Sequence, residues 1–299
     1  MLYIGIDVAK ATLAIFNGNA HHEIANNSRE IKKFLKGLPK DSLLAMEATG
    51  GYGMPLAETA CEMGFTVYML RPQQVIAFRK AMDDRAKTDK KDAELIREFV
   101  AMSHKSLRPF QPLAEPYRSL SRLSRARAAL IQKKASLKLC LEDLGEDASS
   151  LMKALQCHVD KLDTKIEKIL DGIPQAKNLQ TIPSVKTVTV AALLPALASK
   201  NFKNRDAFIA YVGLDLKVVD SGTKKGKRRL SHQGDARMRK ALYMAAMSAS
   251  HSKAWKKQYN HFKEKLPGIA ALNALARKIA KVIFALYKNN TEFGAPHLN

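Results

Sequence analysis

The first 110 residues alternate short apolar runs with segments of helical spacing, and this alternation restricts the fold more than any other feature. Apolar runs of strand length lie at residues 2–8, 12–16, 42–46 and 65–70, and helical patterns lie at residues 31–38, 54–63, 73–82 and 90–102. Strands that alternate with helices form an α/β layer with a largely buried sheet. We therefore expect an α/β domain over residues 1–112, with the second strand antiparallel to the first and with His21 and His22 in a loop.

A long stretch without proline follows, from about residue 117 to residue 170. Leucines and isoleucines recur there at spacings of three, four or seven on both sides of Gly145. This pattern is typical of two helices joined as an antiparallel hairpin. We expect a coiled-coil arm over residues 113–172 that also serves as a dimer contact. A mainly helical domain is expected over residues 173–299, with helices at 205–212, 235–250 and 269–288.

The chain is strongly basic, with 50 Lys+Arg against 28 Asp+Glu and a formal net charge of +22. Such an excess repels itself in a compact fold unless a polyanion neutralises it, and nucleic acid is the usual polyanion. Structural RNA-binding proteins share this balance, so charge indicates the partner and not the activity. The residues expected to contact a nucleic-acid backbone are Arg118, Arg122, Arg125, Lys224, Lys225, Lys227, Arg228, Arg229 and Arg237.

The three cysteines, Cys61, Cys140 and Cys157, have no metal-ligand spacing, and their odd number argues against a disulfide framework. Asp7 and Lys10 interrupt any early apolar run, so no signal peptide is expected. A run of about 18 apolar residues, as needed to cross a membrane, is also missing from the sequence. These features predict a cytoplasmic protein with reduced cysteines and no membrane partner.

Four acids carry the first candidate site. Asp7 and Glu47 each end an apolar strand, and adjacent strands would place both carboxylates at one edge of the sheet. Asp89 and Asp92 are spaced i, i+3 at an expected helix start and share one face. Four converging carboxylates repel one another unless hard cations neutralise them, and Mg²⁺ is the usual cation for phosphodiester cleavage. The simpler interpretation makes Asp89 an N-cap and Asp92 a solvated acid of the first helical turn.

The second candidate site is Ser221, in a Ser-Gly-Thr turn followed by five basic residues among the next six. A serine in a cationic loop can attack a phosphate while the cations stabilise the developing charge. From the residues alone, a solvated basic loop that only binds phosphates is the simpler interpretation.

Several motifs together resemble a known family. Tyr-Ile-Gly-Ile-Asp7-Val-Ala-Lys, Met-Glu47-Ala-Thr-Gly and Lys-Thr-Asp89-Lys-Lys-Asp92-Ala are similar to the signatures of DEDD transposases with a RuvC-like domain. That insertion-sequence family includes bridge-RNA-guided recombinases and Piv-type DNA invertases. Later segments follow in the same order, among them Ile182-Pro183-Ser184-Val185, Ser221-Gly222 and Arg239-Lys240-Ala241-Leu242-Tyr243-Met244.

The resemblance implies a ribonuclease H-like (RuvC-like) N-terminal domain, a coiled-coil arm and a transposase domain with a catalytic serine. By position, it implies that Asp7, Glu47, Asp89 and Asp92 hold Mg²⁺ and that Ser221 is the nucleophile. It also implies DNA as substrate, a structured non-coding guide RNA, and a homodimer that forms a tetramer during strand exchange. One departure is that Ser184 and Lys186 replace glycines usual in the helix-hairpin-helix-like turn, which argues against a standard phosphate-binding hairpin there.

Four other functions stay open at this point. A Piv-like invertase would use the same chemistry without a guide RNA. A Holliday-junction endonuclease would hydrolyse DNA with the four acids alone. An actin-like sugar kinase would use Gly5-Ile6-Asp7 as a phosphate turn, although the net charge of +22 argues against it. A non-catalytic RNA-binding protein would leave the acids at the strand ends unexplained.

Overall fold

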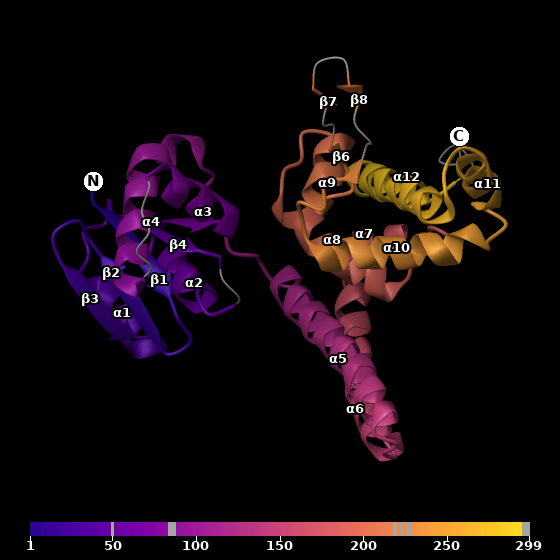
Figure 1. The fold of residues 1–299 in the computed structure, drawn as a ribbon, viewed down its shortest axis with the longest axis horizontal. Coiled ribbons are helices and arrows are strands. Elements are labelled where there is room, and N and C mark those ends of the chain that lie inside the picture. The colour runs from indigo at the N-terminus through magenta and orange to yellow at the C-terminus, as the bar shows by residue number, and fades with distance from the viewer. Residues whose placement is uncertain (49–50, 83–87, 218–219, 222–223, 226–228, 295–299) are drawn as a thin grey trace. The chain divides into compact units, whose positions relative to one another are not determined.

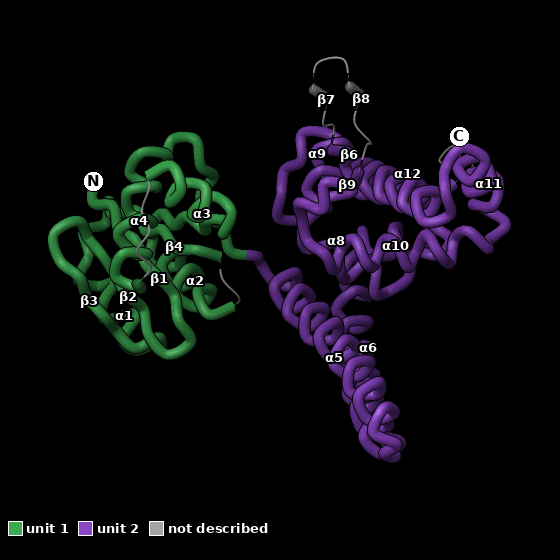
Figure 2. The backbone as a smooth tube through the Cα atoms, in the orientation of Figure 1, with its two compact units in different colours: residues 1–112 green, residues 113–299 purple. Residues whose placement is uncertain are grey.

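A computed structural model of the chain describes residues 1–48, 51–82, 88–217, 220–221, 224–225 and 229–294. The chain forms two compact units, Met1–Pro112 (unit 1) and Leu113–Asn299 (unit 2), shown in different colours in Figure 2. Each unit has its own hydrophobic core. The further division of unit 2 at residue 172, between arm and C-terminal domain, stays a prediction.

Unit 1 is built on a five-stranded mixed sheet in the order β3-β2-β1-β4-β5 (Figure 1). The strands are β1 (Tyr3–Val8), β2 (Thr12–Phe16), β3 (His21–Ala25), β4 (Leu43–Glu47) and β5 (Thr66–Leu70). β1 pairs antiparallel with β2, as predicted, and β2 pairs antiparallel with β3. β1, β4 and β5 run parallel. The carboxyl ends of these three strands therefore lie at one edge of the sheet.

The predicted loop at His21 and His22 is wrong, because both residues belong to β3. Hydrogen bonding to β2 holds this strand, and four of its five residues are exposed. An edge strand that buries almost nothing has no apolar alternation for a sequence pattern to detect.

Helices cover both faces of the sheet. They are α1 (Ser28–Lys36), α2 (Met54–Glu62), α3 (Pro72–Ala81) and α4 (Asp89–Ser103), followed by a short 3₁₀ turn, η1 (His104–Ser106). One core holds Ile4, Ile6 and Leu44 of the sheet together with Ile31 of α1 and Leu56 of α2. The opposite face packs its own apolar residues against α3 and α4.

Gly5 determines how closely α4 approaches β1. A Cβ atom built on Gly5 would lie 2.0 Å from the carbonyl oxygen of Ala93 and 2.5 Å from the backbone nitrogen of Arg97. Only glycine leaves room for a helix backbone at this distance. Gly5 also lies inside β1, with Phe16 and Ala45 as its neighbours, so it does not form the phosphate turn that a sugar kinase would need.

Unit 2 begins with the predicted helical hairpin, formed by α5 (Tyr117–Asp143) and α6 (Ser149–Asp171). The two helices are joined by an Arg127–Asp163 ion pair and by a hydrogen bond of 2.5 Å from Lys134 Nζ to Gln156 Oε1. Gly145, with φ +70°, lies in the turn between them. The helical hairpin therefore forms over nearly the residues that the leucine spacing indicated.

The rest of unit 2 is mainly helical. Its helices are α7 (Pro174–Gln180), α8 (Thr187–Ser199), α9 (Arg205–Val212), α10 (Ala236–Ser250), α11 (Lys256–Lys265) and α12 (Gly268–Asn289). The sequence pattern did not predict α11, which has no buried residue and so no apolar period. No helix of the described residues is long and apolar enough to span a membrane.

Four two-residue strands lie between α9 and α10. β6 (Leu216–Lys217) pairs antiparallel with β9 (Arg229–Leu230), and β7 (Asp220–Ser221) pairs antiparallel with β8 (Lys224–Lys225). The segment expected to be a basic loop therefore contains paired strands, because backbone pairing does not require apolar side chains.

Candidate functional site

The first pair of acids lies where two neighbouring parallel strands end. Ile6 of β1 is opposite Met46 of β4, so Asp7 and Glu47, the next residues, come side by side. Asp7 is half-buried and is also aligned with Ala14 of β2. Glu47 is the last residue of β4 and is half-buried as well. The prediction that two strands deliver two carboxylates to one sheet edge is confirmed.

α4 brings the second pair. Thr88 is its N-cap, and the Thr88 side chain accepts a hydrogen bond from the Lys91 backbone N–H at 3.3 Å. Asp89 is therefore the first residue of the helix. The simpler interpretation, which made Asp89 the N-cap, is wrong. Asp92 follows almost one turn later. Because α4 packs on β1 at Gly5, the start of the helix lies beside the end of that strand.

The pKa of Asp7 reflects the closeness of the other three acids. Burial and the negative charges of Asp92, Asp89 and Glu47 raise the pKa of Asp7 to about 6, against a smaller opposing effect of its hydrogen bond with the Val8 backbone. The other three predicted acids are therefore close enough to act on the carboxyl group of Asp7. A group whose ionised form is opposed by three like charges gains most from a nearby cation.

Arg79 of α3 already supplies one positive charge, through an ion pair with Asp92. Both side chains are largely buried, with 19% and 16% of their surfaces exposed. Asp92 is therefore not the solvated first-turn acid of the simpler interpretation. The sequence pattern did not single out Arg79, because nothing in the spacing of α3 relates it to a residue on the next helix.

The chemistry of the donor set fits a hard divalent cation, since carboxylate oxygens are the ligands that Mg²⁺ prefers. Among the described residues, no three His, Cys, Asp or Glu side chains lie close enough together, in their present positions, to hold one metal ion. Binding through the Asp92 oxygen that Arg79 holds would require this ion pair to open. The attraction of the cation would have to drive that exchange, because the mutual repulsion of the acids opposes it.

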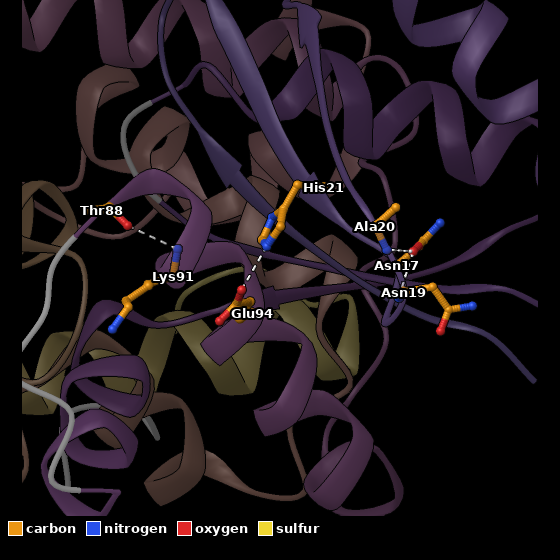
Figure 3. A network of polar contacts seen from close by, with 7 residues as sticks. All are labelled: Asn17, Asn19, Ala20, His21, Thr88, Lys91 and Glu94. Carbon is orange, nitrogen blue, oxygen red and sulfur yellow. Dashed lines mark hydrogen bonds and ion pairs between the residues drawn. The ribbon is translucent and has the colours of Figure 1, made fainter.

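One of the polar contacts in Figure 3 joins α4 to the edge strand β3. His21 Nε2 of β3 lies 2.7 Å from Glu94 Oε1 of α4, and the His21 ring stacks on Phe16. The preceding hairpin turn is closed by Asn17, whose side-chain oxygen accepts hydrogen bonds from the backbone N–H groups of Asn19 and Ala20. Glu94 lies two residues after Asp92, so this contact helps to fix the position of the acids. Sequence reasoning gave His21 no role.

Ser221 lies in unit 2, in strand β7, where its backbone is opposite Lys224. Asp220 is likewise opposite Lys225. Lys227 and Arg228 lie outside the described residues. Arg229 lies in β9, opposite Lys217. Strand pairing therefore places the Ser221 backbone beside two basic positions, Lys224 and Lys225, which is compatible with phosphate binding.

Two of the predicted nucleic-acid contacts, Arg125 of α5 and Arg237 of α10, come together. Burial lowers the pKa of Arg125, and the positive charge of Arg237 lowers it further. Asp235, the N-cap of α10, pairs with Arg237 and compensates one of the two charges. Arg118 is different, because its Nε donates a hydrogen bond of 3.0 Å to the carbonyl oxygen of Leu113 at the base of the arm. Arg122 is exposed on the same helix.

The turn between α7 and α8 keeps a left-handed residue although it lacks the expected glycines. Ser184 has φ +72°, a conformation that glycine adopts at lower cost. The indole N–H of the fully buried Trp255 donates a hydrogen bond of 3.1 Å to the carbonyl oxygen of Pro183 and so holds the turn. Ser184 therefore adopts the left-handed backbone conformation of this turn without a glycine.

Comparisons with known proteins show what this chain resembles. A family model described as "Transposase" of the DEDD, IS110 type matches residues 4–144, and a second, "Transposase IS116/IS110/IS902 family", matches residues 176–261. The pilin gene-inverting protein of Moraxella bovis is 26% identical over 317 aligned residues, which cover 97% of each chain. The transposase for insertion sequence element IS1328 of Yersinia enterocolitica is 27% identical, over 81% of this chain and 82% of its own. The chain therefore matches both IS110-type transposase models, and over most of its length it is similar to transposases and to a pilin gene-inverting protein.

Proposed function

We propose that this protein is a DNA transposase or site-specific recombinase that cuts DNA with cation-bound acids and rejoins it through a phosphoserine intermediate. The observation that carries the proposal is the convergence of Asp7, Glu47, Asp89 and Asp92; burial and the charges of the other three acids together raise the pKa of Asp7 to about 6. Carboxylates that repel one another at the end of parallel strands destabilise the fold unless positive charge neutralises them, and Arg79 pairs with only one of the four.

The sheet supports a ribonuclease H-like (RuvC-like) assignment of unit 1. Its order is β3-β2-β1-β4-β5, with three antiparallel strands at one side and a parallel set at the other. Asp7 ends the central strand, and Glu47 ends the neighbouring parallel strand. The α4 helix then supplies the remaining two acids.

In the proposed mechanism, Asp7, Glu47, Asp89 and Asp92 would hold Mg²⁺, and the bound cation would make the phosphorus of the scissile phosphate more electrophilic. The Ser221 hydroxyl oxygen attacks that phosphorus. A serine–phosphate ester forms, the phosphorus–oxygen bond to the adjoining deoxyribose breaks, and the serine proton passes to the released DNA hydroxyl. One phosphoester replaces another, so the reverse attack by a DNA hydroxyl rejoins the strand without ATP. Lys224 and Lys225 lie in the paired strand beside Ser221 and would stabilise the charge that develops.

Exchange of strands needs two cut sites, so we propose a dimer that assembles into a tetramer, with the serine and the acids of each site on different subunits. Leu139 and Leu144 support arm contacts, since they are 69% and 67% exposed near the end of α5. The net charge of +22 supports a structured guide RNA in addition to DNA.

A Piv-like invertase without guide RNA is the second candidate. The observation that favours it is the similarity, over 97% of both chains, to a protein described as a pilin gene-inverting protein. The two candidates share the acids and the serine, and they differ only in the need for RNA. If RNase treatment leaves recombination unchanged, the invertase is the better description.

The central test is denaturing electrophoresis of the protein after incubation with Mg²⁺ and labelled DNA of its element. The wild-type protein should give a slower DNA band that a protease removes, and Ser221→Ala should not. Ser248→Ala, at an exposed serine of the same unit, is the matched control and should behave as wild type. Asp92→Asn should abolish cleavage while Glu98→Gln, an exposed acid on the same helix, should not. Cutting and rejoining by Ser221→Ala at the wild-type rate would leave an endonuclease that uses water.

A further inference from the structure

The edge of the sheet that carries Asp7 and Glu47 also carries an exposed aromatic residue, Tyr52. The segments that leave the carboxyl ends of the parallel strands meet there, and they include Lys10 after β1, Tyr52 after β4 and Arg71 after β5. All three residues are exposed. Two cationic residues and one aromatic residue therefore lie in the segments that follow the strands ending at this edge.

The Tyr52 backbone is held against the strand ends. The Asn26 side-chain N–H₂ donates one hydrogen bond to the carbonyl oxygen of Ala9, at 2.9 Å, and another to that of Tyr52, at 3.1 Å. Asn26 thus ties the segment after β1 to the segment after β4. Ala9 is two residues from Asp7, so this connection is made directly beside the acids.

The next residue, Gly53, packs on the strands themselves. A Cβ at Gly53 would lie 3.2 Å from Met46 Sδ and 3.6 Å from Val8 Cγ2. Met46 and Val8 are the chain neighbours of Glu47 and Asp7. Tyr52 is therefore positioned by the hydrogen bond at its own carbonyl group and by the packing of Gly53, within a few residues of two acids on two different strands.

The Tyr52 side chain itself remains 49% exposed and is not among the residues of the hydrophobic cores found in the described chain. The backbone of Tyr52 is held by a hydrogen bond, and its ring stays accessible to a ligand because it is not packed into a core. Rings presented in this way bind the flat faces of nucleobases, and cations beside them bind the phosphates that connect those bases.

We propose that Tyr52 stacks on a nucleobase of the DNA strand held at the acids, next to the scissile phosphate, while Lys10 and Arg71 contact the flanking phosphates. This inference rests on the proposed function, because it takes the strand at the acids to be DNA. A base inside a duplex has both faces covered by its neighbours, so stacking requires an unpaired or displaced base. The site should therefore prefer single-stranded to duplex DNA.

Fluorescence of a new tryptophan tests the stacking without any cleavage. The chain has one tryptophan, Trp255, which is fully buried in unit 2, so Tyr52→Trp adds one exposed reporter. Met102→Trp is the matched control, because Met102 is 73% exposed at the other end of α4, about 20 Å along the helix from Asp89. The probes are oligothymidylate of about 20 nucleotides and a duplex of equal length, added to the full chain in EDTA, with binding followed independently by anisotropy.

The expected result is that saturating oligothymidylate quenches the added emission of Tyr52→Trp at least twofold, the duplex quenches it less, and Met102→Trp changes little. Equal changes in the two variants, or no binding of oligothymidylate, would overturn the inference. In cleavage assays with Mg²⁺, Tyr52→Ala should be slower by at least tenfold and Tyr52→Phe should retain the wild-type rate. If the wild-type protein shows no Asp92-dependent cleavage, the proposed function fails. If it cleaves but Tyr52→Trp is not quenched, only the stacking role fails.

Discussion

Replacing Gly5 by alanine should separate α4 from β1 and thereby displace two of the four acids. The added Cβ would lie 2.0 Å from the Ala93 carbonyl oxygen, 2.5 Å from the Arg97 nitrogen and 2.8 Å from Arg97 Cβ. Two of these three atoms are main chain, so no side-chain rotation relieves the overlap. α4 would have to move away by about 1 Å to restore a normal contact.

The magnitude follows from that displacement. Overfilling a packed core costs about 1–3 kcal/mol, and a clash with backbone belongs at the upper end, so we expect a loss of about 3 kcal/mol in the free energy of unfolding. A displacement of about 1 Å in reacting groups costs on the order of 100-fold in rate. DNA cleavage by Gly5→Ala should therefore fall about 100-fold even where the protein remains folded.

Urea unfolding provides the assay, because two signals distinguish the two units. Trp255 fluorescence follows unit 2 alone, and far-ultraviolet circular dichroism follows both units. Gly37→Ala is the matched control, since Gly37 has φ −82° and its Cβ would meet only the Phe34 carbonyl oxygen at 3.5 Å. Gly5→Ala should lower the unit 1 transition and leave the Trp255 transition in place. The reasoning is wrong if Gly5→Ala and Gly37→Ala unfold at the same urea concentration and cleave DNA at the same rate.

Three further results are expected. The folded-state pKa of Asp7, about 6, lies above the ordinary value of 3.8, so without metal the free energy of unfolding should fall as pH rises from about 4 to 6. Asp7→Asn should remove this pH dependence and raise the free energy of unfolding at pH 7 by about 1–2 kcal/mol, a value reduced for solvent screening. Urea unfolding in EDTA at several pH values measures both effects. If the pH dependence of the variant equals that of the wild type, Asp7 is not the group responsible. Arg79→Gln should raise the affinity for Mn²⁺ about tenfold in calorimetric titration, because the metal no longer competes with an ion pair for Asp92; an unchanged or weaker affinity would show that the pair does not oppose metal binding. Leu139→Glu combined with Leu144→Glu should convert a dimer into a monomer in light scattering without loss of helix, and a monomeric wild-type protein would rule out the arm contact.

Much of the architecture could be predicted from local patterns. β1, β2, β4 and β5 bury apolar residues, and their runs of such residues were visible in the sequence. The two arm helices and α10 were visible for the same reason, since each repeats its apolar residues at helical spacing. β3 and α11 were missed because they bury little or nothing. Burial leaves a periodic signal in the sequence, and hydrogen bonding alone does not.

Some features of the candidate site could likewise be predicted from local sequence patterns, and others could not. Asp7 and Glu47 could be recognised because a carboxylate at the end of a buried strand interrupts an apolar pattern, and Asp89 and Asp92 because they share a helical face. The Arg79–Asp92 pair, the His21–Glu94 contact and the Asn26 connection to Tyr52 could not be predicted. Each joins residues on separate elements, whose meeting depends on the order of strands and on the packing of α4 at Gly5. The sequence by itself determined which acids were available, and only the tertiary structure decided that they share one electrostatic environment, because charges interact through distance in space and not through distance along the chain.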